Sequence, residues 1–198
     1  MQNTFLMFIL ITVLYACDLS NTSEPTVPCN GKNYCHIFIS NNDTRGNLVV
    51  SGNGIVAADA ICTASRPPNT GSAKAFLVDG VNRRACTTID CGTGSVGEHI
   101  DWVLSAGREY RRTGGAVVIG TANVDGILEF NLLSAFYATA GTIYTGINDD
   151  YTTGNDCNNW TSTAFTGATG NLVSIDSTAI NDTDRSCNEL HRLLCVEQ

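Results

Sequence analysis

Charged residues are scarce in this chain. They form 15% of its 198 residues, against about a quarter in an average globular protein. Lysine and arginine number 11 against 19 aspartates and glutamates, which gives a formal net charge of −8 at pH 7. Nonspecific binding to nucleic acid requires basic side chains that neutralise phosphates. The shortage of such side chains argues against a nucleic-acid partner.

Catalytic and cofactor motifs are also missing. The sequence has no Gly-x-Ser-x-Gly nucleophile elbow and no His-Glu-x-x-His helix. The three histidines, His36, His99 and His191, are dispersed, and a lone histidine is more often structural than catalytic. Residues 92–97 fit a GxGxxG pattern, but no strand–helix–strand unit surrounds them. We therefore expect neither an enzyme nor a bound cofactor.

Metal-binding spacings are equally rare. No Cys-x2-Cys pair occurs, and only Cys35-His36 joins a cysteine to a histidine, so zinc is not expected. Asp149, Asp150 and Asp156 share one polar loop and carry oxygen atoms of the kind that calcium binds. The competing interpretation is that they are solvated turn residues, because aspartate is common in turns. Asp182 and Asp184, which precede Cys187, are further oxygen donors that folding could bring to this loop.

One long apolar run is present, at residues 5–16. At about 1.5 Å per residue it is too short to span a bilayer core of about 30 Å, but it suits the core of a signal peptide. The segment Leu14-Tyr15-Ala16-Cys17 resembles a bacterial lipobox, although Tyr15 is bulky and no Lys or Arg precedes the run. That resemblance implies a lipoprotein signal peptide at 1–16, a lipid on Cys17 that holds the protein at a membrane, and a polar tether at 17–31. The alternative is an ordinary secretory signal.

Eight cysteines remain after Cys17, an even number that indicates a disulfide framework behind a secretion signal. Sequence alone allows about 105 pairings. Between the cysteines, apolar spacing predicts one amphipathic helix at 54–65, which carries Cys62 on its buried side. A buried helix or strand start is expected at 100–104. Runs of β-branched and aromatic residues predict strands at 36–40, 73–78, 116–119, 126–130, 142–147 and 193–196. These elements indicate one α+β domain at 32–198, with short strands and long loops.

The order of the cysteines and their neighbours resembles a known fold. A helix with Cys62 comes early, Tyr144-Thr-Gly-Ile147 stands where the C-type-lectin-like fold has its Trp-Ile-Gly-Leu-type strand, and Cys195 lies in a final strand. The helix, residues 73–77 and the last hairpin are similar to the endostatin branch of that fold. Together with the lipobox, the chain resembles the leptospiral endostatin-like surface lipoproteins.

The resemblance implies a mixed or antiparallel sheet with one or two short helices. It also implies a disulfide pairing, which is Cys62–Cys195 and Cys157–Cys187, with Cys86–Cys91 and Cys29–Cys35 as local loops. It implies an outer-membrane lipoprotein at the cell surface that binds host extracellular-matrix proteins, such as laminin or fibronectin, or plasma proteins such as complement regulators. A periplasm-facing or secreted protein is the alternative location.

The sequence offers one candidate binding cluster, formed by Arg108, Tyr110, Arg111 and Arg112, with Arg83 and Arg84 as further members. Arginine and tyrosine are favoured anchors of protein interfaces, and basic patches hold sulfated glycans. The competing interpretation is that these arginines only neutralise nearby acidic residues. Two other functions remain open, a calcium-dependent carbohydrate-binding lectin and a structural envelope lipoprotein without a host ligand.

Overall fold

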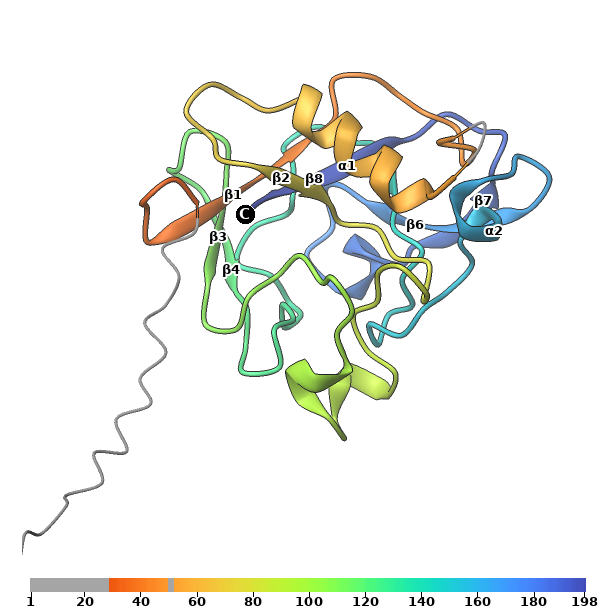
Figure 1. Cartoon of the computed structure of the whole chain (residues 1–198). Helices are drawn as coiled ribbons and strands as arrows, with labels where there is room; N and C mark the ends of the chain where they lie inside the picture. Colours follow the sequence, from red (N-terminus) through yellow and green to blue (C-terminus); the bar gives the residue numbers. More distant parts are fainter. Residues whose placement is uncertain (1–28, 50–51) are drawn as a thin grey trace, which may run out of the picture.

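A computed structural model describes residues 29–49 and 52–198 (Figure 1). The expected signal peptide at 1–16, the expected lipid on Cys17 and nearly all of the expected tether at 17–31 lie outside the described residues. Within the described ranges, no helix combines the length and the apolar character that a membrane crossing requires.

The domain is built on a mixed sheet, as expected. Seven of its eight strands run in the order β4-β3-β1-β8-β5-β6-β7, and the eighth, β2, pairs with β8 outside this path. The β1/β3 and β5/β8 pairs are parallel and the others antiparallel. The strands are β1 (Tyr34–Ile39), β2 (Ala73–Ala75), β3 (Glu109–Arg112), β4 (Val118–Thr121), β5 (Thr142–Tyr144), β6 (Thr166–Asn171), β7 (Thr183–Ser186) and β8 (Arg192–Glu197).

The last strand, β8, is the centre of the sheet. It pairs antiparallel with β1 and β2 and parallel with β5. Leu193 and Cys195 belong to the apolar cluster on the side of helix α1, whereas Leu194 and Val196 belong to the cluster on the opposite face. A strand that is buried on both faces has a continuous apolar sequence rather than an alternating one. This is why Leu193-Leu-Cys-Val196 is uninterrupted.

Helix α1 (Gly54–Ala64) covers one face of the sheet and lies over β2 and β8 (Figure 1). Its first turn is capped by Asn53, whose side chain accepts hydrogen bonds from the backbone N–H groups of Ile55 and Val56. The predicted helix and its buried side are confirmed, because Ile55 and Cys62 are buried. The remaining helical pieces are short: α2 (Cys157–Trp160), η1 (Ile89–Cys91), η2 (Ser95–Glu98) and η3 (Ser177–Ala179).

Four disulfides hold the described part of the chain together. They join Cys62 to Cys195, Cys157 to Cys187, Cys86 to Cys91 and Cys29 to Cys35. This is the pairing that the resemblance implied. The first bridge fastens α1 to β8, and the second lies beside Gly46, where a Cβ atom would lie 2.7 Å from the Cβ of Cys187. Glycine is therefore required at position 46.

Several predicted elements are wrong or shifted. Residues 126–130 form no strand, because the Asn123 side chain accepts hydrogen bonds from the backbone N–H groups of Asp125 and Ile127 and makes a turn instead. Residues 100–104 form neither a helix nor a strand. The strand predicted at 73–78 ends at 75, the one at 142–147 ends at 144, and the one at 116–119 lies at 118–121. Strands β3, β6 and β7 were not predicted.

Candidate functional site

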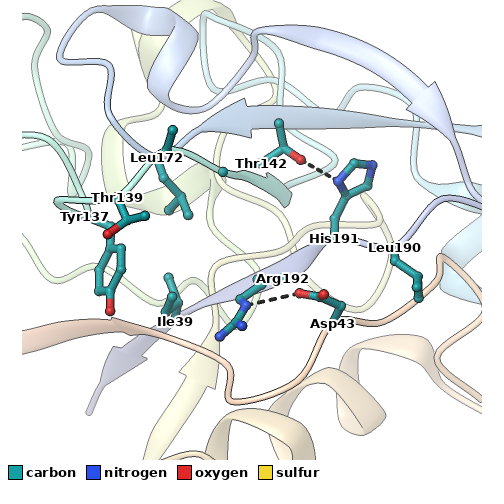
Figure 2. Close-up of a pocket in the computed structure, with 11 residues that line it drawn as sticks. Ile39, Asp43, Tyr137, Thr139, Thr142, Leu172, Leu190, His191 and Arg192 are labelled. Carbon is teal, nitrogen blue, oxygen red and sulfur yellow. Dashed lines mark hydrogen bonds and ion pairs between the residues drawn. The ribbon is translucent and has the colours of Figure 1, made fainter.

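A cavity of about 510 Å³ opens where β1 ends and β8 begins (Figure 2). Its lining comes from the end of β1 and the following loop, from residues 137–142 ahead of β5, from Leu172 after β6, and from residues 190–192. A second cavity of about 420 Å³ adjoins it and shares Ile39, Tyr137 and Arg192. Residues 65–68, after helix α1, line the far side of this second cavity. We refer to the two cavities together as the Arg192 groove.

One wall of the first cavity is polar. The Nε of Arg192 donates to a carboxylate oxygen of Asp43 at 3.0 Å, and Nη1 donates to the carbonyl oxygen of Ser40 at 2.8 Å. The guanidinium is thus held beside a carboxylate, and the Arg192 and Asp43 side chains stay 38% and 50% exposed. The pair therefore presents a positive and a negative charge side by side at the surface of the cavity.

His191 completes the polar wall as a buried imidazole. Its Nδ1 is hydrogen-bonded to the hydroxyl of Thr142, and its Nε2 lies 3.6 Å from the carboxylate of Glu189, too far for a hydrogen bond. Burial lowers the pKa of His191, although Glu189 acts in the opposite direction. The ring is therefore neutral at pH 7 and leaves Arg192 and Asp43 as the charges of this wall.

The facing wall is largely apolar, although it includes the hydroxyl groups of Tyr137 and Thr139. Figure 2 shows these two residues with Ile39 and Leu172 on one side of the cavity. Thr142, His191, Leu190, Arg192 and Asp43 lie on the other side. Arg112 holds the backbone of this wall, because its guanidinium donates to the carbonyl oxygens of Ala135 at 2.7 Å and Tyr137 at 3.1 Å. The cavity can therefore take a ligand with one apolar side and one charged or polar side.

The predicted binding cluster does not form one exposed patch. Tyr110 is 1% exposed, and its hydroxyl oxygen accepts a hydrogen bond from the backbone N–H of Ser105. Burial raises the pKa of Tyr110 to about 12. A side chain so deeply buried is part of the core and does not contact a partner.

The arginines of this cluster are engaged within the domain. Arg111 donates to the carboxylate of Glu109 at 2.6 Å and lies over the ring of Tyr34, 4.3 Å from its centroid. Arg108 donates to the carbonyl oxygen of Asn33 at 3.3 Å. Arg83, considered as a further member, is completely buried and Arg84 is partly buried. These contacts agree with the competing interpretation that the arginines serve the structure.

The calcium candidates Asp149, Asp150 and Asp156 lie in two different places. Asp149 and Asp150 are near Asp90, whose pKa is raised by burial and by the charges of the two other carboxylates. Asp156 caps the turn of α2 by accepting a hydrogen bond from the backbone N–H of Asn159 at 3.1 Å. Within 29–49 and 52–198, no group of three or more His, Cys, Asp or Glu side chains is arranged to hold a metal ion.

Sequence reasoning missed the residues of the groove. Asp43 was part of a loop without a motif, Tyr137 belonged to no predicted element, and His191 was interpreted as structural. These positions are separated by up to about 150 residues and share no spacing pattern. The single local signal is the His191-Arg192 pair at the start of the predicted last strand.

Comparison with known families gives one match. A family model described as "Protein of unknown function (DUF1554)" matches residues 41–178, more than half of the chain. The chain belongs to this family. No curated protein matches it. The matched range of the DUF1554 family includes helix α1 together with Asp43, Tyr137 and Thr142 of the groove.

Proposed function

We propose that this member of the DUF1554 family is an endostatin-like surface lipoprotein with a C-type-lectin-like domain that binds host extracellular-matrix proteins. The arrangement of its ends supports the proposed fold. Cys62 in the first helix is bonded to Cys195 in the last strand, and Cys157 is bonded to Cys187 between them. The resemblance of the sequence to endostatin-like lipoproteins implies this nested pairing.

The observation that carries the proposed binding function is the Arg192 groove. Its two cavities lie side by side on a disulfide-bonded scaffold, where loops can recognise a partner without large rearrangement. Arg66 and Arg192 line the groove and are accessible, in a protein whose net charge is −8. Arginine and tyrosine are frequent hot spots of protein interfaces, and Tyr137 supplies the tyrosine.

We expect the substitution Arg66→Glu to weaken binding to immobilised laminin or fibronectin by roughly tenfold, equivalent to about 1.4 kcal/mol. Arg66 is exposed, and its Nε donates to the carbonyl oxygen of Thr63 at 3.1 Å. The matched control is Arg45→Glu. Arg45 is also exposed and donates from Nε to a backbone carbonyl, that of Asn188, but it lines neither cavity. Equal losses in the two variants, or no loss at Arg66, would contradict a role of the groove.

A structural envelope lipoprotein is the competing function, and exposure at the cell surface separates the two. On intact cells that express the full chain, added proteinase K should remove nearly all of the domain, as followed with an antibody against it. A periplasmic marker protein should stay intact in the same sample. If the domain resists proteinase K until the cells are lysed, it faces inward, and the proposed binding to host matrix proteins fails.

A further inference from the structure

The first cavity of the groove has a charge pattern that favours one class of small ligand. Its polar wall places the Arg192 guanidinium 3.0 Å from the Asp43 carboxylate, and its facing wall carries Ile39, Tyr137 and Leu172 (Figure 2). We propose that this cavity binds a free α-amino acid with an apolar side chain, in zwitterionic form. The proposal concerns a small ligand and does not depend on the proposed binding of matrix proteins.

Charge complementarity separates the zwitterion from ions of a single sign. An anion would be attracted by Arg192 and repelled by Asp43, and a cation would experience the reverse. A zwitterion gains from both charges, because its carboxylate can accept hydrogen bonds from the guanidinium while its ammonium group donates to the carboxylate. The Arg192 guanidinium has five N–H groups. The bonds to Asp43 and Ser40 use the one on Nε and one of the two on Nη1, so the remaining N–H groups can donate to a ligand.

The other residues of the cavity keep this charge balance and supply the apolar contact. His191 is buried and neutral at pH 7, because burial lowers its pKa, so it adds no third charge. Leu190 also lines the cavity, is 56% exposed and lies beside His191 and Asp43 in Figure 2, so it adds apolar surface on that side. The volume of about 510 Å³ lies within the range of about 300–1,000 Å³ that is usual for small-molecule sites.

The test is saturation-transfer NMR on the native protein with four probes at up to about 10 mM, above an expected dissociation constant of about 1 mM. L-leucine should bind. N-acetyl-L-leucine lacks the ammonium charge and L-leucinamide lacks the carboxylate, so each should bind at least about tenfold more weakly. Glycine keeps both charges without the side chain and should also bind more weakly. Because the series uses the native protein, its outcome does not depend on whether a variant folds.

A variant then assigns the binding to this cavity. Asp43→Asn keeps the shape of the side chain but removes its charge. It should reduce the affinity for L-leucine by about tenfold and should not weaken the binding of N-acetyl-L-leucine, an anion that the Asp43 carboxylate repels. Asp182→Asn, at an exposed position outside the cavity, is the matched control and should leave L-leucine binding unchanged.

Three results would overturn the proposal. These are no saturation transfer from L-leucine, equal binding of L-leucine and its N-acetyl derivative, and binding of a neutral sugar such as glucose in place of the amino acid. The last result would assign the cavity to hydroxyl-rich ligands, for which the paired charges act only as hydrogen-bonding groups.

Discussion

Replacing Cys62 and Cys195 together by serine is expected to lower the free energy of unfolding by roughly 5 kcal/mol, against roughly 2 kcal/mol for the Cys86 and Cys91 pair. The two bridges close loops of very different length, with sequence separations of 133 and 5 residues. In the chain-entropy description, a cross-link stabilises the fold by restricting the unfolded chain, and the restriction grows with the length of the closed loop.

The environment of the long bridge adds to this difference. Cys195 lies in β8, which pairs with three other strands, and Cys62 lies on the buried side of α1. Thermal unfolding should therefore move down by roughly 10–20 °C for the first double variant and roughly 4–8 °C for the second, at about 2–4 °C per kcal/mol for a domain of this size. Equal shifts in melting temperature for the two double variants would contradict the larger entropic effect of the Cys62–Cys195 bridge on the unfolded chain.

Replacing Arg83 by methionine is expected to destabilise the domain by roughly 2–3 kcal/mol. Its hydrogen bonds to two carboxylates are lost, but the Asp59 and Asp101 side chains are 24% and 40% exposed, so water can solvate them. Arg83 is fully buried, and its guanidinium donates to the Asp59 carboxylate at 2.8 Å and to the Asp101 carboxylate at 2.5 Å. It also donates to the carbonyl oxygen of Ala75 at 2.8 Å. A single side chain therefore joins α1, β2 and the loop at 101.

The neighbouring arginine provides the matched control. Arg84 is partly buried and donates through Nε to the carbonyl oxygen of Glu98 at 3.0 Å. Arg84→Met removes one such hydrogen bond, and Arg84 forms no ion pair within the described residues, so a loss of about 1 kcal/mol is expected. Denaturant unfolding measures both variants. Similar losses at positions 83 and 84 would mean that the ion pairs of Arg83 do not contribute beyond an ordinary hydrogen bond.

Elements whose signals are local could be predicted. Helix α1 was predicted from apolar residues at helical spacing, a signal that acts within a few residues. Strand β8 is an apolar run of its own, so its existence was clear from its composition. Its position at the centre of the sheet was not, since that depends on which strands pair with it.

Strand β6 was missed for the opposite reason. Its sequence, Thr166-Gly-Ala-Thr-Gly-Asn171, contains small residues that are typical of loops. The structure requires them: a Cβ at position 167 would lie 2.7 Å from the sulfur of Cys157, and one at position 170 would collide with the carbonyl oxygen of Ala179. Glycine in a strand marks a close approach of other atoms, and the sequence does not say which atoms approach.

The basic cluster shows that the exposure of a side chain cannot be predicted from its neighbours in the sequence alone. Residues 108–112 have the composition of a binding patch, yet residues 109–112 form strand β3. Tyr110 lies in the core, and the Arg112 guanidinium donates to the carbonyl oxygen of Tyr137. Composition reports which contacts a side chain can make. Whether it makes them with a partner or with its own domain depends on the neighbours that folding brings to it.

By itself the sequence determined the class of fold, the helix with its buried cysteine and the apolar last strand, because these follow from spacing and composition within short segments. Only the tertiary structure decided the groove, since Asp43, Tyr137 and Arg192 come from distant loops and strands that meet around β8. The physical reason is that a binding site requires charged and apolar side chains at fixed distances from one another. For residues remote in the sequence, those distances are fixed only when the strands pair.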